Sequence, residues 1–133
     1  MCMLLKVDHR GPKRPAQRGK ASWKPWLENV RWEKISSPWG EPSDELLFGT
    51  LEDIQLVFLP RHGRGHRFSP SSVNYRANID ALKRAGVTDI VSLSAVGSFH
   101  EHLAPGTFVI VDQFIDRTFA RQKSFFGQKN SRQ

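Results

Sequence analysis

The sequence runs Ile54-Gln55-Leu56-Val57-Phe58-Leu59 and continues as Pro60-Arg61-His62-Gly63-Arg64-Gly65-His66. The first part is mostly apolar and predicts a β-strand, whereas the second part is basic and rich in glycine. Arginine offers a planar fork of donors that matches phosphate oxygens, and glycine lets the backbone approach a ligand closely. Because ligands of open α/β sheets bind at the carboxyl ends of strands, this stretch predicts an anion-binding loop. A solvated basic turn is the alternative interpretation.

The composition fits one domain, since the chain has 133 residues with 38% hydrophobic and 25% charged residues. The single cysteine, Cys2, has no partner for an internal disulfide, which favours a reducing compartment. No apolar run approaches the roughly 20 residues of a membrane span. We therefore expect a cytoplasmic enzyme, or a fragment of one, without membrane contact.

The net charge of +7 lies mainly at the two ends of the chain. Residues 1–25 carry +6 and residues 128–133 carry +2, so that residues 26–127 carry −1. A basic flank can bind phosphate backbones without specificity. We expect no specific nucleic-acid binding, and a binder that acts through residues 1–25 remains as an alternative.

Three further segments follow the basic loop: Asn74-Tyr75-Arg76-Ala77-Asn78-Ile79, Ser94-Ala95-Val96-Gly97-Ser98 and Asp112-Gln113-Phe114-Ile115-Asp116-Arg117-Thr118. In this order and spacing the chain resembles the methylthioadenosine phosphorylase branch of the purine nucleoside phosphorylase family. The resemblance covers residues 27–127. Its specific motifs are the Arg-His-Gly-Arg-Gly-His cluster and the Asp-Gln-Phe-Ile-Asp-Arg-Thr run.

The expected fold class is α/β, as a partial phosphorylase/hydrolase-like mixed sheet with flanking helices. We expect a disordered basic tail at residues 1–26, a partial phosphorylase domain at 27–127 and a tail outside the family pattern at 128–133. Apolar runs predict strands at residues 45–49, 54–59, 89–94 and 107–111, with a hairpin around Glu52-Asp53.

A helix is predicted over residues 74–85, with a hydroxyl cap from Ser71 or Ser72 and a stop at Gly86. Its apolar face is predicted from the spacing of Ala77, Ile79, Ala81, Leu82 and Ala85. Strand, helix and strand then suggest a right-handed βαβ crossover through residues 89–94.

The resemblance implies phosphorolysis of S-methyl-5'-thioadenosine to adenine and 5-methylthioribose-1-phosphate, which is a pentosyl transfer of purine and methionine salvage. It implies a nucleoside and inorganic phosphate as substrates, no cofactor, no metal and a homotrimer. The phosphate would contact Arg61, His62, Ser94 and Ala95. His62 could donate from its ring or its backbone amide, and Ala95 only from its backbone. His66 is either close to the substrate or an ordinary surface histidine.

The resemblance also places an apolar strand with a glycine-rich loop before Leu27, and residues 1–25 show nothing similar. The residues that bind the base and the ribose in the family have no counterpart in this sequence. We therefore expect the chain to be weakly active or inactive alone. The alternative is a non-catalytic fragment that associates with intact phosphorylase subunits.

Overall fold

A computed structural model of the chain describes residues 2–5, 26–122 and 124–126. Most of the predicted basic tail and all of the tail at 128–133 lie outside the described residues. Contacts divide the chain into two units, Met1–Ser94 and Ala95–Gln133. The helix and strands of the described residues all lie in the first unit.

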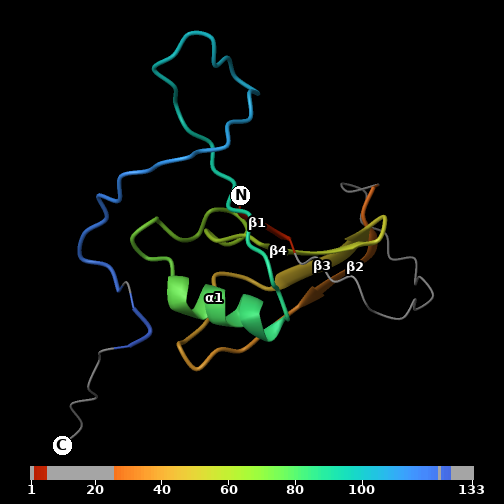
Figure 1. The fold of residues 1–133 in the computed structure, drawn as a ribbon. Helices are drawn as coiled ribbons and strands as arrows, with labels where there is room; N and C mark the ends of the chain where they lie inside the picture. The colour runs from red at the N-terminus through yellow and green to blue at the C-terminus, as the bar shows by residue number, and fades with distance from the viewer. Residues whose placement is uncertain (1, 6–25, 123, 127–133) are drawn as a thin grey trace, which may run out of the picture. The chain divides into compact units, whose positions relative to one another are not determined.

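The first unit holds a sheet in the order β1-β4-β3-β2, with every described pairing antiparallel. Its strands are β1 (Cys2–Leu5), β2 (Glu28–Glu33), β3 (Leu46–Leu51) and β4 (Ile54–Leu59), as Figure 1 shows. The hairpin predicted around Glu52-Asp53 is confirmed, because Leu51 pairs with Ile54 at its turn. Glu52 adopts a positive φ of 54° there, which tight hairpin turns require.

Alternation along β3 and β4 sends apolar side chains to both faces of the sheet. On one face the buried residues Leu46, Val57 and Leu59 pack against Leu82 of the helix α1 (Tyr75–Arg84). The opposite face gathers a second buried cluster, which consists of Leu27, Leu47, Leu56 and Phe58. The predicted partial α/β domain, a sheet with a helix packed on it, is thus confirmed.

The predicted helix is confirmed, but its cap differs from the expectation. Asn74, not Ser71 or Ser72, caps α1: its Oδ1 accepts a hydrogen bond from the backbone N–H of Ala77 at 3.1 Å. The Ser72 hydroxyl instead donates to the Ser69 carbonyl. Asn74 is the better cap because its amide also donates to the Trp39 carbonyl at 2.9 Å and so ties the helix start to a distant turn.

The end and the buried face of α1 follow the pattern with one exception. Gly86 has a φ of 78° and forms the predicted stop, while the N–H of Val87 bonds to the Leu82 carbonyl at 3.0 Å. Ala77, Ala81 and Leu82 are buried, but Ile79 is 42% exposed, so its place in the apolar face was wrong. Asn78 is buried instead, and its side-chain amide forms hydrogen bonds with Ser43.

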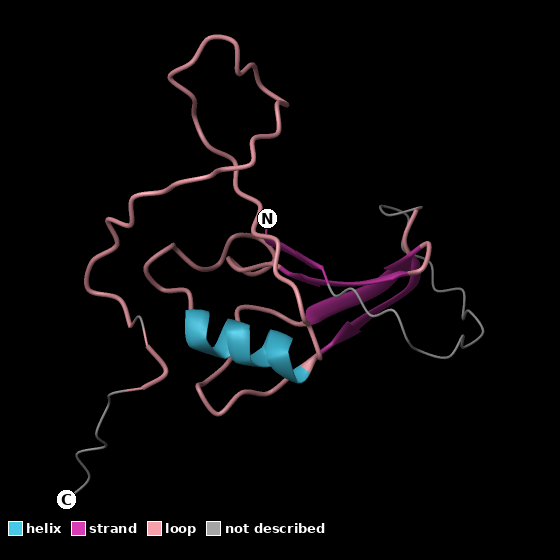
Figure 2. Cartoon of the chain, viewed as in Figure 1, coloured by secondary structure: helices cyan, strands magenta, loops and turns pink. Residues whose placement is uncertain are grey.

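Three expectations about strands were wrong. Residues 89–94 and 107–111 form loops, so no βαβ crossover exists among the described residues (Figure 2). Residues 2–5, expected within the disordered tail, form the edge strand β1. Residues 89–94 do not pair with β4, because β1 and β3 already lie on its two sides.

The second unit consists of turns and loops in its described residues. Short turns order it locally, such as the bonds from Leu103 N to His100 O and from Thr107 N to Ala104 O, each 3.1 Å. Its large apolar side chains lie open, with Phe108 90% and Ile110 98% exposed. Among the described residues of the chain, no helix has the length and apolar character that a bilayer crossing requires.

Candidate functional site

The basic loop, residues 60–69, follows directly from the end of β4 and folds on itself through backbone hydrogen bonds. Gly63 N donates to Pro60 O at 2.7 Å, and Phe68 N donates to His62 O at 3.0 Å. Gly63 has a φ of 71°, in the left-handed region where glycine carries no steric penalty. A Cβ at Gly63 would also lie 3.1 Å from the Ser43 carbonyl oxygen, so the loop packs closely on the residues before β3.

Arg61 connects this loop to the segment after α1. Its Nη2 donates to Ser94 Oγ at 3.0 Å, and its Nε donates to His62 Nε2 at 3.2 Å. The structure therefore brings together Arg61, His62 and Ser94, although Ser94 stands 33 positions after Arg61 in the sequence. A guanidinium and a hydroxyl at this separation can contact oxygens of the same anion.

The neighbours of His62 fix its tautomer. Arg61 Nε can only donate, so His62 Nε2 must accept and carries no proton. The other ring nitrogen, Nδ1, lies 2.8 Å from the Phe68 carbonyl, which can only accept, so Nδ1 carries the proton. Both ring nitrogens are thus engaged within the protein.

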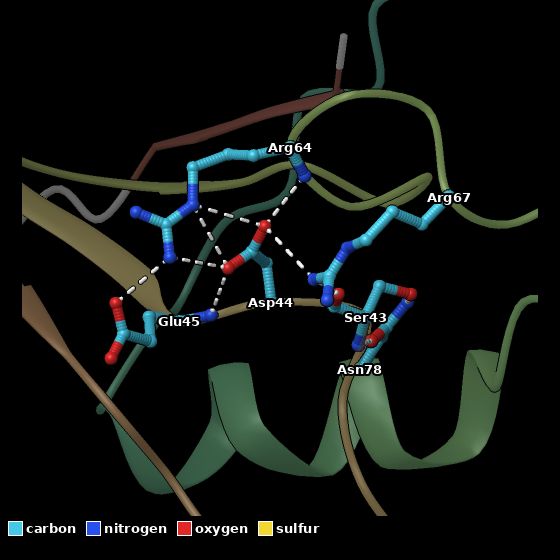
Figure 3. A network of polar contacts seen from close by, with 6 residues as sticks. All are labelled: Ser43, Asp44, Glu45, Arg64, Arg67 and Asn78. Atoms are coloured by element: carbon cyan, nitrogen blue, oxygen red, sulfur yellow. Dashed lines mark hydrogen bonds and ion pairs between the residues drawn. The ribbon is translucent and has the colours of Figure 1, made fainter.

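A carboxylate beneath the loop holds two further arginines (Figure 3). The side chain of Asp44 is only 3% exposed and accepts hydrogen bonds from Arg64 N at 2.6 Å and Arg64 Nη2 at 2.8 Å. Arg67 Nη2 lies 3.5 Å from the same carboxylate and donates to the Ser43 carbonyl at 3.1 Å. Glu45 accepts a further hydrogen bond from Arg64 Nη2 at 2.9 Å.

The contacts between Asp44 and Arg64 lower the pKa of Asp44 and raise the pKa of Arg64. Burial acts to raise the pKa of Asp44, but the hydrogen bonds from Arg64 and the backbone N–H of Glu45 outweigh it and hold the pKa below its ordinary value. The hydrogen bond to Asp44 raises the pKa of Arg64, against the opposing effect of burial. The pair is therefore charged at neutral pH.

The helix α1 holds Ser43, the residue that precedes Asp44, through hydrogen bonds with Asn78. Asn78 of α1 accepts a hydrogen bond from Ser43 N at 2.7 Å and donates to Ser43 Oγ at 3.0 Å. Both residues are buried, and each satisfies polar groups of the other that would be costly to leave unpaired. Residue 43 is thereby fixed to α1, and Asp44 follows it directly in the chain.

The other two predicted site residues are His66, which contacts His62, and Ala95, which belongs to the second unit. The ring of His66 stacks on that of His62, with centroids 5.7 Å apart and an interplanar angle of 11°. His66 is exposed, so both interpretations of its role remain open. Ala95 belongs to the second unit, and its contact with an anion stays a prediction.

Sequence reasoning missed the part that Asp44 plays. Asp44 stands 20 positions before Arg64, in a segment whose prolines and glycine indicate only a turn. No local pattern joins the two residues, because the β3–β4 hairpin is what brings them together. Among the residues that the structure describes, no group of three or more His, Cys, Asp or Glu side chains is arranged to hold a metal ion.

Comparison with known proteins finds close relatives of this chain. It is 69% identical over 102 residues to the S-methyl-5'-thioadenosine phosphorylase of Rhodospirillum rubrum, covering 77% of this chain and 35% of the relative. It is 68% identical over 101 residues to the S-methyl-5'-thioadenosine phosphorylase of Cereibacter sphaeroides, covering 76% of this chain and 35% of the relative. The chain thus spans about a third of the length of these relatives.

A solved structure agrees with the sequence relatives. The methylthioadenosine phosphorylase of Schistosoma mansoni in complex with adenine superposes with a TM-score of 0.70 at 48% identity, covering 76% of this chain and 36% of that one. The family model described as "Phosphorylase superfamily" matches residues 27–132, which include the basic loop, Asp44 and Ser94. The chain belongs to the phosphorylase superfamily.

Proposed function

We propose that Arg61, His62 and Ser94 bind inorganic phosphate, and that the protein to which this chain belongs uses that phosphate to cleave S-methyl-5'-thioadenosine. The observation that carries the proposal is the 3.0 Å contact between Arg61 Nη2 and Ser94 Oγ. These groups come from two segments far apart in the sequence, in a chain whose relatives bear the name of this phosphorylase.

In the proposed reaction a phosphate oxygen attacks the anomeric carbon of the ribose. A C–O bond to phosphate forms while the C–N bond to adenine breaks, and the released base takes the electron pair and a proton. The products are adenine and 5-methylthioribose-1-phosphate. Phosphate needs little activation at neutral pH, so the task of the site is to position it, and positioning can lower a barrier by up to about 7–11 kcal/mol.

The contacts within the site suggest which donors would meet the anion. Arg61 supplies charge-assisted hydrogen bonds and Ser94 supplies a hydroxyl. Because both ring nitrogens of His62 are engaged, its backbone N–H is the donor that we assign to phosphate. Ala95 would add a second backbone N–H. A nucleoside partner, a homotrimeric assembly and a cytoplasmic location belong to the same proposal.

The test is phosphate binding by the Arg61→Gln variant. A hydrogen bond to a charged group contributes about 1.5–3 kcal/mol. Its loss should weaken the affinity for phosphate about 10–100-fold. Isothermal titration in a phosphate-free buffer measures this, with Lys83→Gln as the control because it removes one positive charge from the exposed last turn of α1. Equal affinity of Arg61→Gln and the wild type would refute the proposal.

A second candidate function is a non-catalytic chain that associates with intact phosphorylase subunits. It is favoured by the exposed apolar side chains of the second unit, including Phe108, Ile110 and Ile115 at 90%, 98% and 88% exposure. The two candidates differ in association. Co-purification of this chain with an intact homologue supports the associating chain, whereas a strictly monomeric or aggregated product counts against it.

A further inference from the structure

The three arginines of the basic loop differ in what their guanidinium groups contact. Arg61 reaches Ser94, whereas Arg64 and Arg67 turn to the buried carboxylate of Asp44 (Figure 3). Arg64 also bonds to Glu45 and lies over the Trp32 ring at 4.3 Å. Its Nε and Nη2 donors and one face of its plane are therefore already used by the protein.

We propose that Asp44 is a positioning residue of the site: it holds Arg64 and so sets the loop in which Arg61 contacts both His62 and Ser94. The inference rests on the proposed phosphate-binding function. Asp44 does not touch the anion in this account. It acts through the backbone of the loop and through two arginines that it keeps away from the ligand.

The contact with the backbone shows why Asp44 governs the loop and not only two side chains. Its Oδ2 accepts from Arg64 N at 2.6 Å, in the middle of the loop. One residue earlier, Gly63 approaches Ser43 so closely that a Cβ there would meet the Ser43 carbonyl at 3.1 Å. The loop is thus attached at adjacent positions to the segment that holds Asp44.

That segment is itself immobilised by the core. Ser43 is buried and bonded twice to Asn78, and the next strand begins at Leu46, whose side chain is 1% exposed. A continuous series of contacts therefore runs from α1 through Ser43 and Asp44 to Arg64. Removal of the carboxylate breaks this series where the loop joins it and leaves the core contacts of Ser43 intact.

The experiment compares Asp44→Asn, Arg64→Lys and the double variant with the wild-type chain. Arg64→Lys keeps the charge but loses the planar fork, and it replaces a half-exposed side chain, so it should fold even if the buried Asp44→Asn does not. Glu41→Gln is the matched control, because it also removes a carboxylate from an ion pair, the exposed pair with Lys34 at 3.2 Å.

Two readouts that do not depend on phosphate report the loop. Amide hydrogen exchange at Gly63 and His66 should become about tenfold faster in the variants through local opening, while Ala85, whose N–H at the end of α1 bonds to Ala81 O, exchanges as in the wild type. The ring ¹⁵N shifts of His62 should change from one fixed tautomer to an average of two. A residue that only stabilised the fold globally would accelerate exchange in α1 to the same extent.

The third readout is the affinity for inorganic phosphate, which should fall about tenfold. Losses of this size are found in metal sites when a residue that orients a metal ligand is removed. The double variant should lose no more affinity than either single variant, because both substitutions break the same contact.

Two results would overturn the inference. One is unchanged amide exchange in the loop, and the other is tighter phosphate binding, which would mean that the released arginines are ligands. Absence of phosphate binding in the wild type would refute the proposed function, while the loop readouts would still decide the role of Asp44.

Discussion

Arg61, Arg64 and Arg67 carry the same charge in one loop, yet they meet different surroundings. Asp44 accepts hydrogen bonds from Arg64 and lies close to Arg67, and Glu45 also pairs with Arg64, so two carboxylates face these two guanidinium groups. Arg61 instead donates to an imidazole and a hydroxyl, and neither is a carboxylate that offers it a countercharge. At the scale of single residues, the anion-binding capacity of the loop therefore lies with Arg61.

The ionisation of Asp44 leads to a prediction about pH. Its folded-state pKa lies below its ordinary value, so its stabilising effect is complete above the unfolded-state pKa of about 3.9 and is lost as pH falls through the folded value. We expect the difference in free energy of unfolding between wild type and Asp44→Asn to stay constant from about pH 7 to pH 5 and to shrink below about pH 4. Urea unfolding at each pH measures it. A difference that grows on acidification would contradict the assignment.

The two halves of this site differ in how far the sequence could predict them. The grouping of Arg61, His62 and Ser94 was implied by the resemblance to the phosphorylase family, and Arg61 contacts both other residues, although the strand expected to end at Ser94 is a loop. The part of Asp44 could not be predicted in this way, because its contact with Arg64 depends on the hairpin register. A turn residue has the same local signature whether or not its carboxylate is buried.

At the scale of elements, the register of β3 and β4 decides which side chains reach each face. Leu46 and Val57 meet α1, whereas Leu47 and Phe58 join Leu27 on the other face. The hairpin and α1 could be predicted because their signals are local: alternating apolar residues, a two-residue turn and a glycine stop. Residues 89–94 have an equally apolar pattern, but an apolar run does not specify which strand it would pair with, and both sides of β4 are taken by β1 and β3.

Gly49 of β3 provides a test of this packing. A Cβ at Gly49 would overlap the side chain of the buried Leu27. Gly49→Ala should therefore destabilise the fold by about 1–3 kcal/mol, the usual cost of overpacking a core. Urea unfolding measures the effect.

A companion variant and a control make this test specific. In a Leu27→Ala background the added cost of Gly49→Ala should largely vanish, because the overlapping atoms are gone. Gly97→Ala should be neutral, since a Cβ there meets no atom within 4 Å. Additive effects of Gly49→Ala and Leu27→Ala would show that the two residues do not pack on each other.

At the scale of the whole molecule, charge and apolar surface are distributed unevenly. Residues 1–25 carry +6 and residues 128–133 carry +2, whereas residues 26–127, which make up most of the range that the family model matches, carry −1. The second unit exposes Phe108, Ile110 and Ile115, whose apolar runs indicated buried structure. Composition can predict that such residues favour burial, but it cannot supply the surface against which they would pack.

The most direct test of the account is a phosphate titration of the ¹⁵N-labelled chain, followed by amide and arginine side-chain signals. We expect saturable shifts at Arg61 Nε and at the amides of His62 and Ser94, with one common affinity, and no such shifts with chloride at equal ionic strength. In Arg61→Gln the amide shifts of His62 and Ser94 should saturate only at about 10–100-fold higher phosphate concentrations. Shifts confined to the lysine and arginine residues of segment 1–25, without saturation at Arg61 or Ser94, would contradict the proposal that this site binds phosphate.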